Sequence, residues 1–131
     1  MQNIIGTWAL VRARATTEDG KPAPTPYGGD KGMGRLTLNA DGRMMAVLCD
    51  GRPSMAPGET RENNSYCGNY TFDGARLVTK VDASSDPARM STDQVRDVRF
   101  EGELMVLRPP ARVIGGQKVQ RELWWKKIAD V

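Results

Sequence analysis

The residues of this chain that could do chemistry are arginines and tyrosines at alternating positions of extended segments. Arg12, Arg96 and Arg121 come from three different segments, and Tyr66 and Tyr70 come from a fourth. An unpaired guanidinium is costly to bury, so arginines that face an interior need carboxylates, water or an anionic ligand. A guanidinium fork matches a carboxylate or enolate, and tyrosines add hydroxyls and apolar rings. The pattern predicts a pocket for a small, mostly apolar metabolite that is anionic, carbonyl-containing or aromatic.

The chain has no histidine among its 131 residues. This removes the commonest metal ligand and the commonest acid/base group. Cys49 and Cys67 match no metal-site spacing, and we interpret them as reduced structural thiols that point outward. We therefore predict that the protein uses no metal and no cofactor.

Catalysis is the alternative to binding. A cofactor-independent lyase, isomerase or cyclase would use Arg96 to stabilise an enolate or phenolate, with Tyr66 or Tyr70 as general acid. The general base is the missing part, and Asp50 is the carboxylate that we nominate for it. A third alternative is a scaffold whose interior is filled by side chains.

Short alternating segments position these residues. Asp-Gly and Glu-Gly turns separate several of them, and Pro/Gly-rich loops cover residues 18–31 and 50–62. Eight strands with mostly hairpin connections predict an all-β, up-and-down antiparallel barrel with a central cavity, as one domain over residues 1–131. The strands are expected at residues 6–15, 34–39, 43–49, 64–72, 75–83, 94–100, 103–108 and 118–128.

The turns assign the faces of the strands, because residues opposite each other in a hairpin share a face. We use a three-residue loop that ends in Gly42, and two-residue loops at Asp73-Gly74 and Glu101-Gly102. Trp8 and Leu10 are taken to face inward, which carries Arg12 and Arg14 with them. The predicted ligand-binding set is Arg12, Leu36, Met44, Tyr66, Tyr70, Thr79, Arg96, Val98, Arg121 and Trp125.

Some of these side chains have plainer interpretations. Arg14 lies near a strand end, where a solvated position at the rim is the simpler reading. Arg96 has Asp93 and Glu103 as alternative partners, Trp8 suits a plug at the closed end of the barrel, and Tyr27 lies in a turn that could also serve as a lid.

The composition limits the partners. The net charge is +3 and the basic residues are scattered among acidic ones, so no nucleic-acid-binding arm is expected. No apolar stretch reaches the roughly 20 residues of a membrane helix, so no membrane partner is expected. Because a strand pattern begins at residue 6, we expect no signal peptide and a cytoplasmic location. A monomer and a homodimer both remain open.

Several short motifs occur in a fixed order along the chain: Gly6-Thr7-Trp8 with Leu10-Val11, Pro26-Tyr27-Gly28, Gly34 with Leu36, Asp41-Gly42-Arg43-Met44 with Ala46, Tyr66-Cys67-Gly68 with Tyr70, Thr92-Asp93-Gln94-Val95-Arg96 and Leu123 with Trp125. Together they resemble the lipocalin-like domain family of small bacterial and fungal proteins, which are relatives of the lipocalin and fatty-acid-binding barrels. The resemblance covers nearly the whole chain, and it implies an eight-stranded barrel with a central cavity. It does not imply one function, because relatives look like small-molecule binders and several barrel cousins are cofactor-free isomerases, cyclases or lyases.

One position departs from the family pattern. The strand after the Tyr-Cys-Gly motif often carries a His-His pair in the family, and this chain has Thr79-Lys80 there. Chemistry that relies on an inward histidine at that position is therefore not implied here.

Chelator treatment tests the prediction that no metal is used. Without histidine, and with both cysteines facing outward, no soft-ligand site can assemble. Dialysis against EDTA should leave the melting temperature unchanged, as measured by circular dichroism before and after treatment. A drop that added Zn²⁺, Mg²⁺ or Ca²⁺ restores would contradict the prediction.

Overall fold

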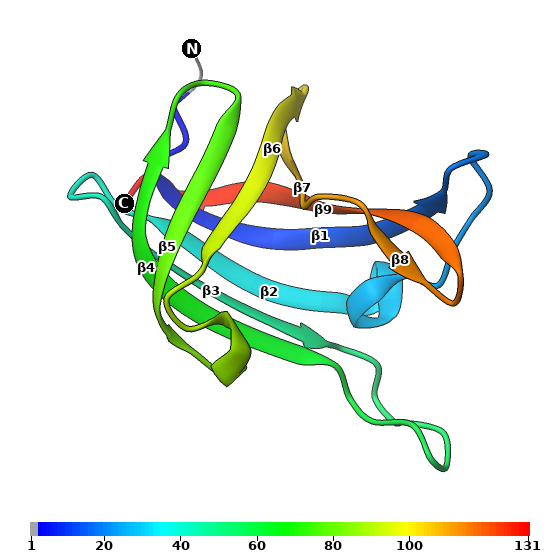
Figure 1. Cartoon of the computed structure of the whole chain (residues 1–131). Helices are drawn as coiled ribbons and strands as arrows, with labels where there is room; N and C mark the ends of the chain where they lie inside the picture. The colour runs from blue at the N-terminus through cyan, green and yellow to red at the C-terminus, as the bar shows by residue number, and fades with distance from the viewer. Residues whose placement is uncertain (1–2) are drawn as a thin grey trace.

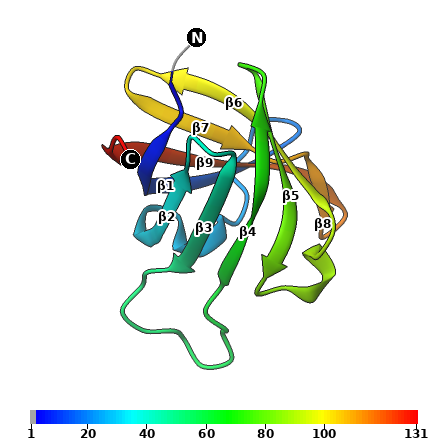
Figure 2. The same cartoon turned by 90° about the vertical axis from the view of Figure 1, so that its left-hand side faces the viewer.

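Antiparallel pairing of successive strands closes the sheet on itself (Figures 1 and 2). The computed structural model describes residues 3–131. The order around the barrel is β1-β2-β3-β4-β5-β6-β7-β9, and β9 pairs back onto β1 to close it. The barrel strands are β1 (Gly6–Thr17), β2 (Gly32–Leu38), β3 (Arg43–Asp50), β4 (Asn63–Phe72), β5 (Arg76–Ser84), β6 (Asp93–Glu101), β7 (Leu104–Arg108) and β9 (Gln117–Ala129).

The predicted all-β, eight-stranded up-and-down barrel is therefore confirmed, with every predicted strand end within two residues of the observed one. Sequence reasoning missed a short extra strand, β8 (Arg112–Ile114), which lies outside the barrel and pairs with β9. It also missed two short 3-10 helices, η1 (Pro26–Lys31) and η2 (Pro87–Arg89). All three lie in segments expected to be loops. No helix in residues 3–131 is long and apolar enough to cross a membrane.

The hairpin of β2 and β3 follows the expected alternation. Leu38 pairs with Met44 and Leu36 pairs with Ala46, and all four side chains are buried. Gly42 closes the loop between the two strands with a φ of 88°, a left-handed conformation that favours glycine. The apolar face of this hairpin forms one wall of the barrel interior.

Two other hairpins pair two residues away from the predicted register. Phe72 pairs with Leu77 rather than Ala75, and Phe100 pairs with Met105 rather than Glu103. Because side chains alternate with a period of two, a shift of two residues changes the partner and keeps the face. Met105 and Leu107 are accordingly buried in the core, on the face that the two-residue loop at Glu101-Gly102 predicts.

The prediction that Arg12 faces inward is wrong. A β-bulge between Leu10 and Arg12 shifts the register of β1 against β9, so the alternation inverts beyond it. Ala13 and Ala15 are buried, Arg14 is exposed, and the Arg12 guanidinium lies 4.4 Å from the ring centre of Trp124. Val106 alternates with the inward-facing Met105 and Leu107, and it is fully buried beside Trp124 on the outer face of the barrel.

The third residue of the Tyr-Cys-Gly motif, Gly68, lies where only a glycine fits between two strands. It follows a register shift between Cys67 and Gly68, where β4 comes very close to β5. A Cβ on Gly68 would lie 1.9 Å from the backbone oxygen of Lys80, so any side chain would force the two strands apart.

Replacing Gly68 with alanine should therefore destabilise the barrel by about 2 kcal/mol or more, since backbone must move to relieve the clash. Urea unfolding followed by circular dichroism measures the change. Thr71→Ala, at an exposed position of the same strand, is the control and should stay within about 0.5 kcal/mol. A Gly68→Ala protein as stable as this control would show that β4 and β5 are not in close contact there.

Candidate functional site

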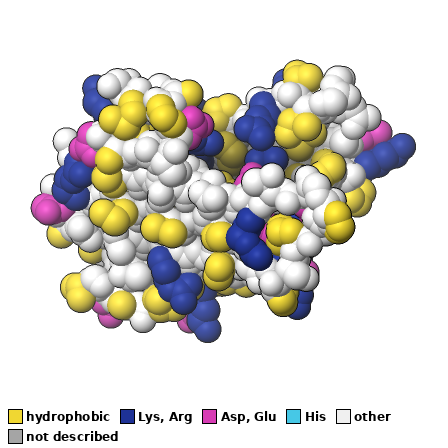
Figure 3. Space-filling view, turned by 90° about the horizontal axis from the view of Figure 1, so that it is seen from below, with side chains coloured by type: hydrophobic (Ala, Val, Ile, Leu, Met, Phe, Trp, Pro, Cys, Tyr) yellow, Lys and Arg dark blue, Asp and Glu magenta, His cyan; other side chains and the backbone are white. Residues whose placement is uncertain are grey.

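A cavity of about 220 Å³ opens into the barrel interior. Its apolar wall comes from β2, β3, β5 and β9, which contribute side chains such as Leu36, Met44, Leu77 and Trp125. The space-filling view from below shows a hollowed face where basic and apolar side chains meet (Figure 3). The site thus combines an apolar interior with cationic groups.

Four arginines line the cavity. Arg96 lies on β6 and Arg121 on β9, while Arg89 ends η2 and Arg112 begins β8. None of the described residues that line the cavity is aspartate or glutamate. The charged side chains that line the cavity are therefore all cations.

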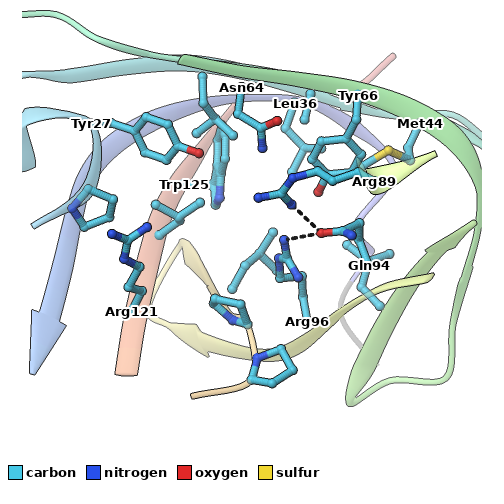
Figure 4. A pocket seen from close by; sticks show the side chains of 18 of the residues that line it. Tyr27, Leu36, Met44, Asn64, Tyr66, Arg89, Gln94, Arg96, Arg121 and Trp125 are labelled. Carbon is cyan, nitrogen blue, oxygen red and sulfur yellow. Dashed lines mark hydrogen bonds between the residues drawn. The ribbon is translucent and has the colours of Figure 1, made fainter. Parts of the chain in front are cut away.

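Arg89 and Arg96 converge on one neutral acceptor (Figure 4). Gln94 Oε1 accepts a hydrogen bond from Arg89 Nη1 at 2.5 Å and another from Arg96 Nη2 at 3.1 Å. Gln94 Nε2 donates to Thr92 Oγ1 at 3.1 Å, which turns the amide oxygen toward the two guanidinium groups. The predicted alternatives, a pairing of Arg96 with Asp93 or with Glu103, are not what the structure shows.

Arg121 lies at the other side of the cavity. Its nearest carboxylate is Glu62, with 3.7 Å between Arg121 Nη1 and Glu62 Oε2. Arg121 Nε is buried and has no hydrogen-bond partner among the described residues. Burial, and to a smaller degree the charge of Arg112, lowers the pKa of Arg121 from its usual value. Arginine nevertheless stays protonated near neutral pH, so the cavity holds an incompletely compensated cation here.

Tyr27 enters the cavity from η1 and faces Asn64 in Figure 4. Its backbone nitrogen donates to Glu62 Oε1 at 2.8 Å, and its own φ of 54° is unusual for a side-chain-bearing residue. Burial, followed by the charge of Glu62, raises the pKa of the Tyr27 phenol. The hydroxyl therefore stays protonated and can donate a hydrogen bond to a ligand.

Six members of the predicted ligand-binding set line the cavity: Leu36, Met44, Tyr66, Arg96, Arg121 and Trp125. Four members do not. Arg12 lies outside the barrel because of the bulge, Val98 packs on the core, and Thr79 is buried without lining the cavity. Tyr70 donates its hydroxyl to the backbone oxygen of Asn39 at 2.7 Å and borders a separate shallow hollow with Ile4.

Some lining residues were missed. Asn64 and Gln94 stand two positions before Tyr66 and Arg96, so the same alternation could have found them. Arg89 and Arg112 come from segments expected to be loops, where no periodicity indicates direction. Tyr27, considered as a lid or a simple turn, does line the cavity.

The barrel, its internal cavity and the turn motifs define a lipocalin-type architecture. The chain belongs to the lipocalin-like domain family, whose model matches residues 5–128. Neither the curated proteins nor the solved structures contain a significant match to the chain. The family supports small-molecule binding in general, and the choice of ligand must come from the cavity itself.

Asp50, which we nominated as a general base, binds Arg52 outside the cavity. Its carboxylate accepts hydrogen bonds from the backbone and side chain of Arg52, with 2.6 Å between Asp50 Oδ2 and Arg52 Nη2. It does not line the cavity. These hydrogen bonds lower the pKa of Asp50 below its ordinary 3.8, so the group is a poor base as well as a distant one. We interpret it as the anchor of the loop that follows β3.

Replacing Asp50 with asparagine should lower the melting temperature at pH 7. A carboxylate with a lowered folded-state pKa stabilises above its ordinary pKa of 3.8, and the contribution disappears as pH falls through the lowered value. The difference in melting temperature between the variant and the parent protein should therefore become smaller below pH 4. Glu59→Gln, which removes the exposed second partner of Arg52, is the control and should change little. If the difference in melting temperature stays constant as the pH falls, the charge of Asp50 does not cause the loss of stability in the variant.

Proposed function

We propose that this protein binds a small, mostly apolar, anionic molecule in the barrel cavity. The observation that carries the proposal is the composition of the cavity: four arginines and, among the described lining residues, no carboxylate. Arg89, Arg96 and Arg121 are partly buried, while Arg112 is exposed at the rim. A guanidinium that loses hydration without gaining a carboxylate is destabilising, and an anionic ligand is the partner that offsets this cost. The apolar wall with Leu36, Met44 and Trp125 then contacts the body of the ligand.

The size of the cavity indicates the scale of the ligand. Its volume of about 220 Å³ exceeds the roughly 150 Å³ of an apolar cavity that holds benzene. A body of one or two fused aromatic rings, or an aliphatic body of similar bulk, fits this space. Tyr66, Tyr27 and Asn64 supply polar groups that can fix its orientation.

Binding is better supported than proton-transfer catalysis. Lyase or isomerase chemistry on a carbonyl compound needs a base, and the chain contains no histidine. Asp50 is held by Arg52 outside the cavity, and Tyr70 is directed away from it. Arg96 and Tyr66 both line the cavity and can contact an anion there, a role that needs no base.

The substitution Arg96→Met tests the proposal with 2-naphthoate and its methyl ester as probes. The change removes a charge and keeps a similar volume, so the barrel should stay folded. It should weaken binding of the carboxylate by roughly 2–5 kcal/mol, because a desolvated charge pair is lost, and barely affect the ester. Calorimetric titration measures both.

The matched control is Arg14→Met, which removes an exposed arginine from the outer face. It should leave both affinities unchanged. Equal loss for acid and ester in Arg96→Met would assign Arg96 a structural role, and no loss for either would place the guanidinium outside the binding site. Failure of the parent protein to prefer the acid over the ester would overturn the proposed function.

A further inference from the structure

We propose that the ligand carries two acidic groups, one at each end of an apolar body, an inference that rests on the proposed anion binding. The four arginines of the cavity form two pairs, one on η2 and β6 and the other on β9 and β8. Each pair has one more positive charge than the carboxylates beside it. A ligand with two separated anionic groups matches this arrangement, and a monoacid leaves one pair uncompensated.

The first pair is Arg89 with Arg96. Its one carboxylate partner among the described residues is Asp86, with 3.7 Å between Asp86 Oδ2 and Arg89 Nε. Arg96 donates to the backbone oxygen of Val95 and to Gln94 Oε1, both neutral acceptors. Two guanidinium groups thus share a neutral amide oxygen where an oxyanion would bind more strongly. One ligand carboxylate or phenolate could join or replace Gln94 Oε1 at this point.

The second pair is Arg121, which is partly buried, with Arg112, which is exposed at the start of β8. Glu62 is its one carboxylate within ion-pair distance in the described part of the chain, at 3.7 Å from Arg121. The Glu62 carboxylate also accepts a hydrogen bond from the backbone nitrogen of Tyr27, so it is shared between Tyr27 and Arg121. Arg121 Nε is buried without a hydrogen-bond partner there. Glu62 therefore compensates this pair only in part, and a second ligand anion beside Arg121 would balance the remaining charge.

The two pairs are on different parts of the barrel. Arg89 and Arg96 belong to η2 and β6, while Arg121 and Arg112 belong to β9 and β8. In Figure 4 the indole of Trp125 lies between Arg121 on one side and Arg89 with Arg96 on the other. The apolar surface between the cationic pairs fits a ring or chain that joins two acidic groups. A carboxylate that binds at one pair leaves the net charge of the other pair in place, so the second charge should add affinity.

The test compares diacids with their monoesters. Two diacids of different span, benzene-1,4-dicarboxylate and naphthalene-2,6-dicarboxylate, are titrated with their monomethyl and dimethyl esters at constant pH and ionic strength. At least one diacid should bind about 10- to 100-fold more tightly than its own monoester, the gain expected from one more charge-assisted interaction. The monoester should in turn bind more tightly than the diester.

Substitutions in each arginine pair then test whether each carboxylate of the diacid binds at its own pair. Arg96→Met and Arg121→Met should each remove most of the advantage of the diacid over the monoester, and the double variant should bind diacid and diester alike. Diester affinity reports that the cavity is intact in each variant, and Arg14→Met again serves as the unaffected control.

The outcomes separate this inference from the proposed function. If neither diacid binds more tightly than its monoester, while the monoester still exceeds the diester, the two-anion inference is overturned and anion binding stands. If acids and esters bind alike in the parent protein, the proposed function fails as well. A diacid advantage that survives in both single variants would also overturn the inference, because the second charge would then be held elsewhere.

Discussion

The pairing of β1 with β9 is the constraint on which the rest of the structure depends. This ladder joins the two ends of the sheet and runs from Thr7 to Thr17 along β1. Without it the barrel would have two open edges, and the cavity would be a sheet surface rather than an enclosed space. The bulge within the same ladder, between Leu10 and Arg12, decides which side chains of β1 enter the interior. The pairing of β1 with β9 therefore both closes the barrel and decides which side chains of β1 face the interior.

The bulge also makes room for the cationic group on the neighbouring strand. Beyond it Ala13 faces inward opposite Leu123, and Ala15 faces inward opposite Arg121. Alanine occupies little space, so the long side chain of Arg121 can extend along the wall without a bulky neighbour across the pair. Had the alternation continued unbroken, Arg12 would have pointed into the interior, and its stacking on Trp124 would be lost. The outer Arg–Trp contact, worth about 0.5–1 kcal/mol at an exposed site, favours the bulged register.

The fold was largely predictable because most of its determinants are local. Alternation in residues 34–49 with a glycine at the turn fixes the faces of β2 and β3, and a two-residue error at the later hairpins left the faces intact. The prediction failed where one extra residue enters a strand, since Val11 and Arg12 look like any other alternating pair. The site was predictable only where it lies on regular strands, as for Tyr66, Arg96 and Arg121. Arg89 and Arg112 reach the cavity from irregular segments, whose direction depends on tertiary contacts.

The acidic residues around the barrel mouth neutralise the cavity arginines only in part, because two of them also hold backbone groups. Asp50 binds Arg52 and orders the start of the following loop, and Glu62 holds the backbone of Tyr27. Gln94, where a glutamate would have formed a strong ion pair with Arg89 and Arg96, is neutral. Such an interior gives up some stability, because guanidinium groups lose hydration without gaining a full counter-charge. Local departures from the most stable arrangement are expected where a protein keeps a site open for a ligand. The neutral acceptor between two arginines is therefore the feature that ties the electrostatics of this barrel to the anion binding that we propose.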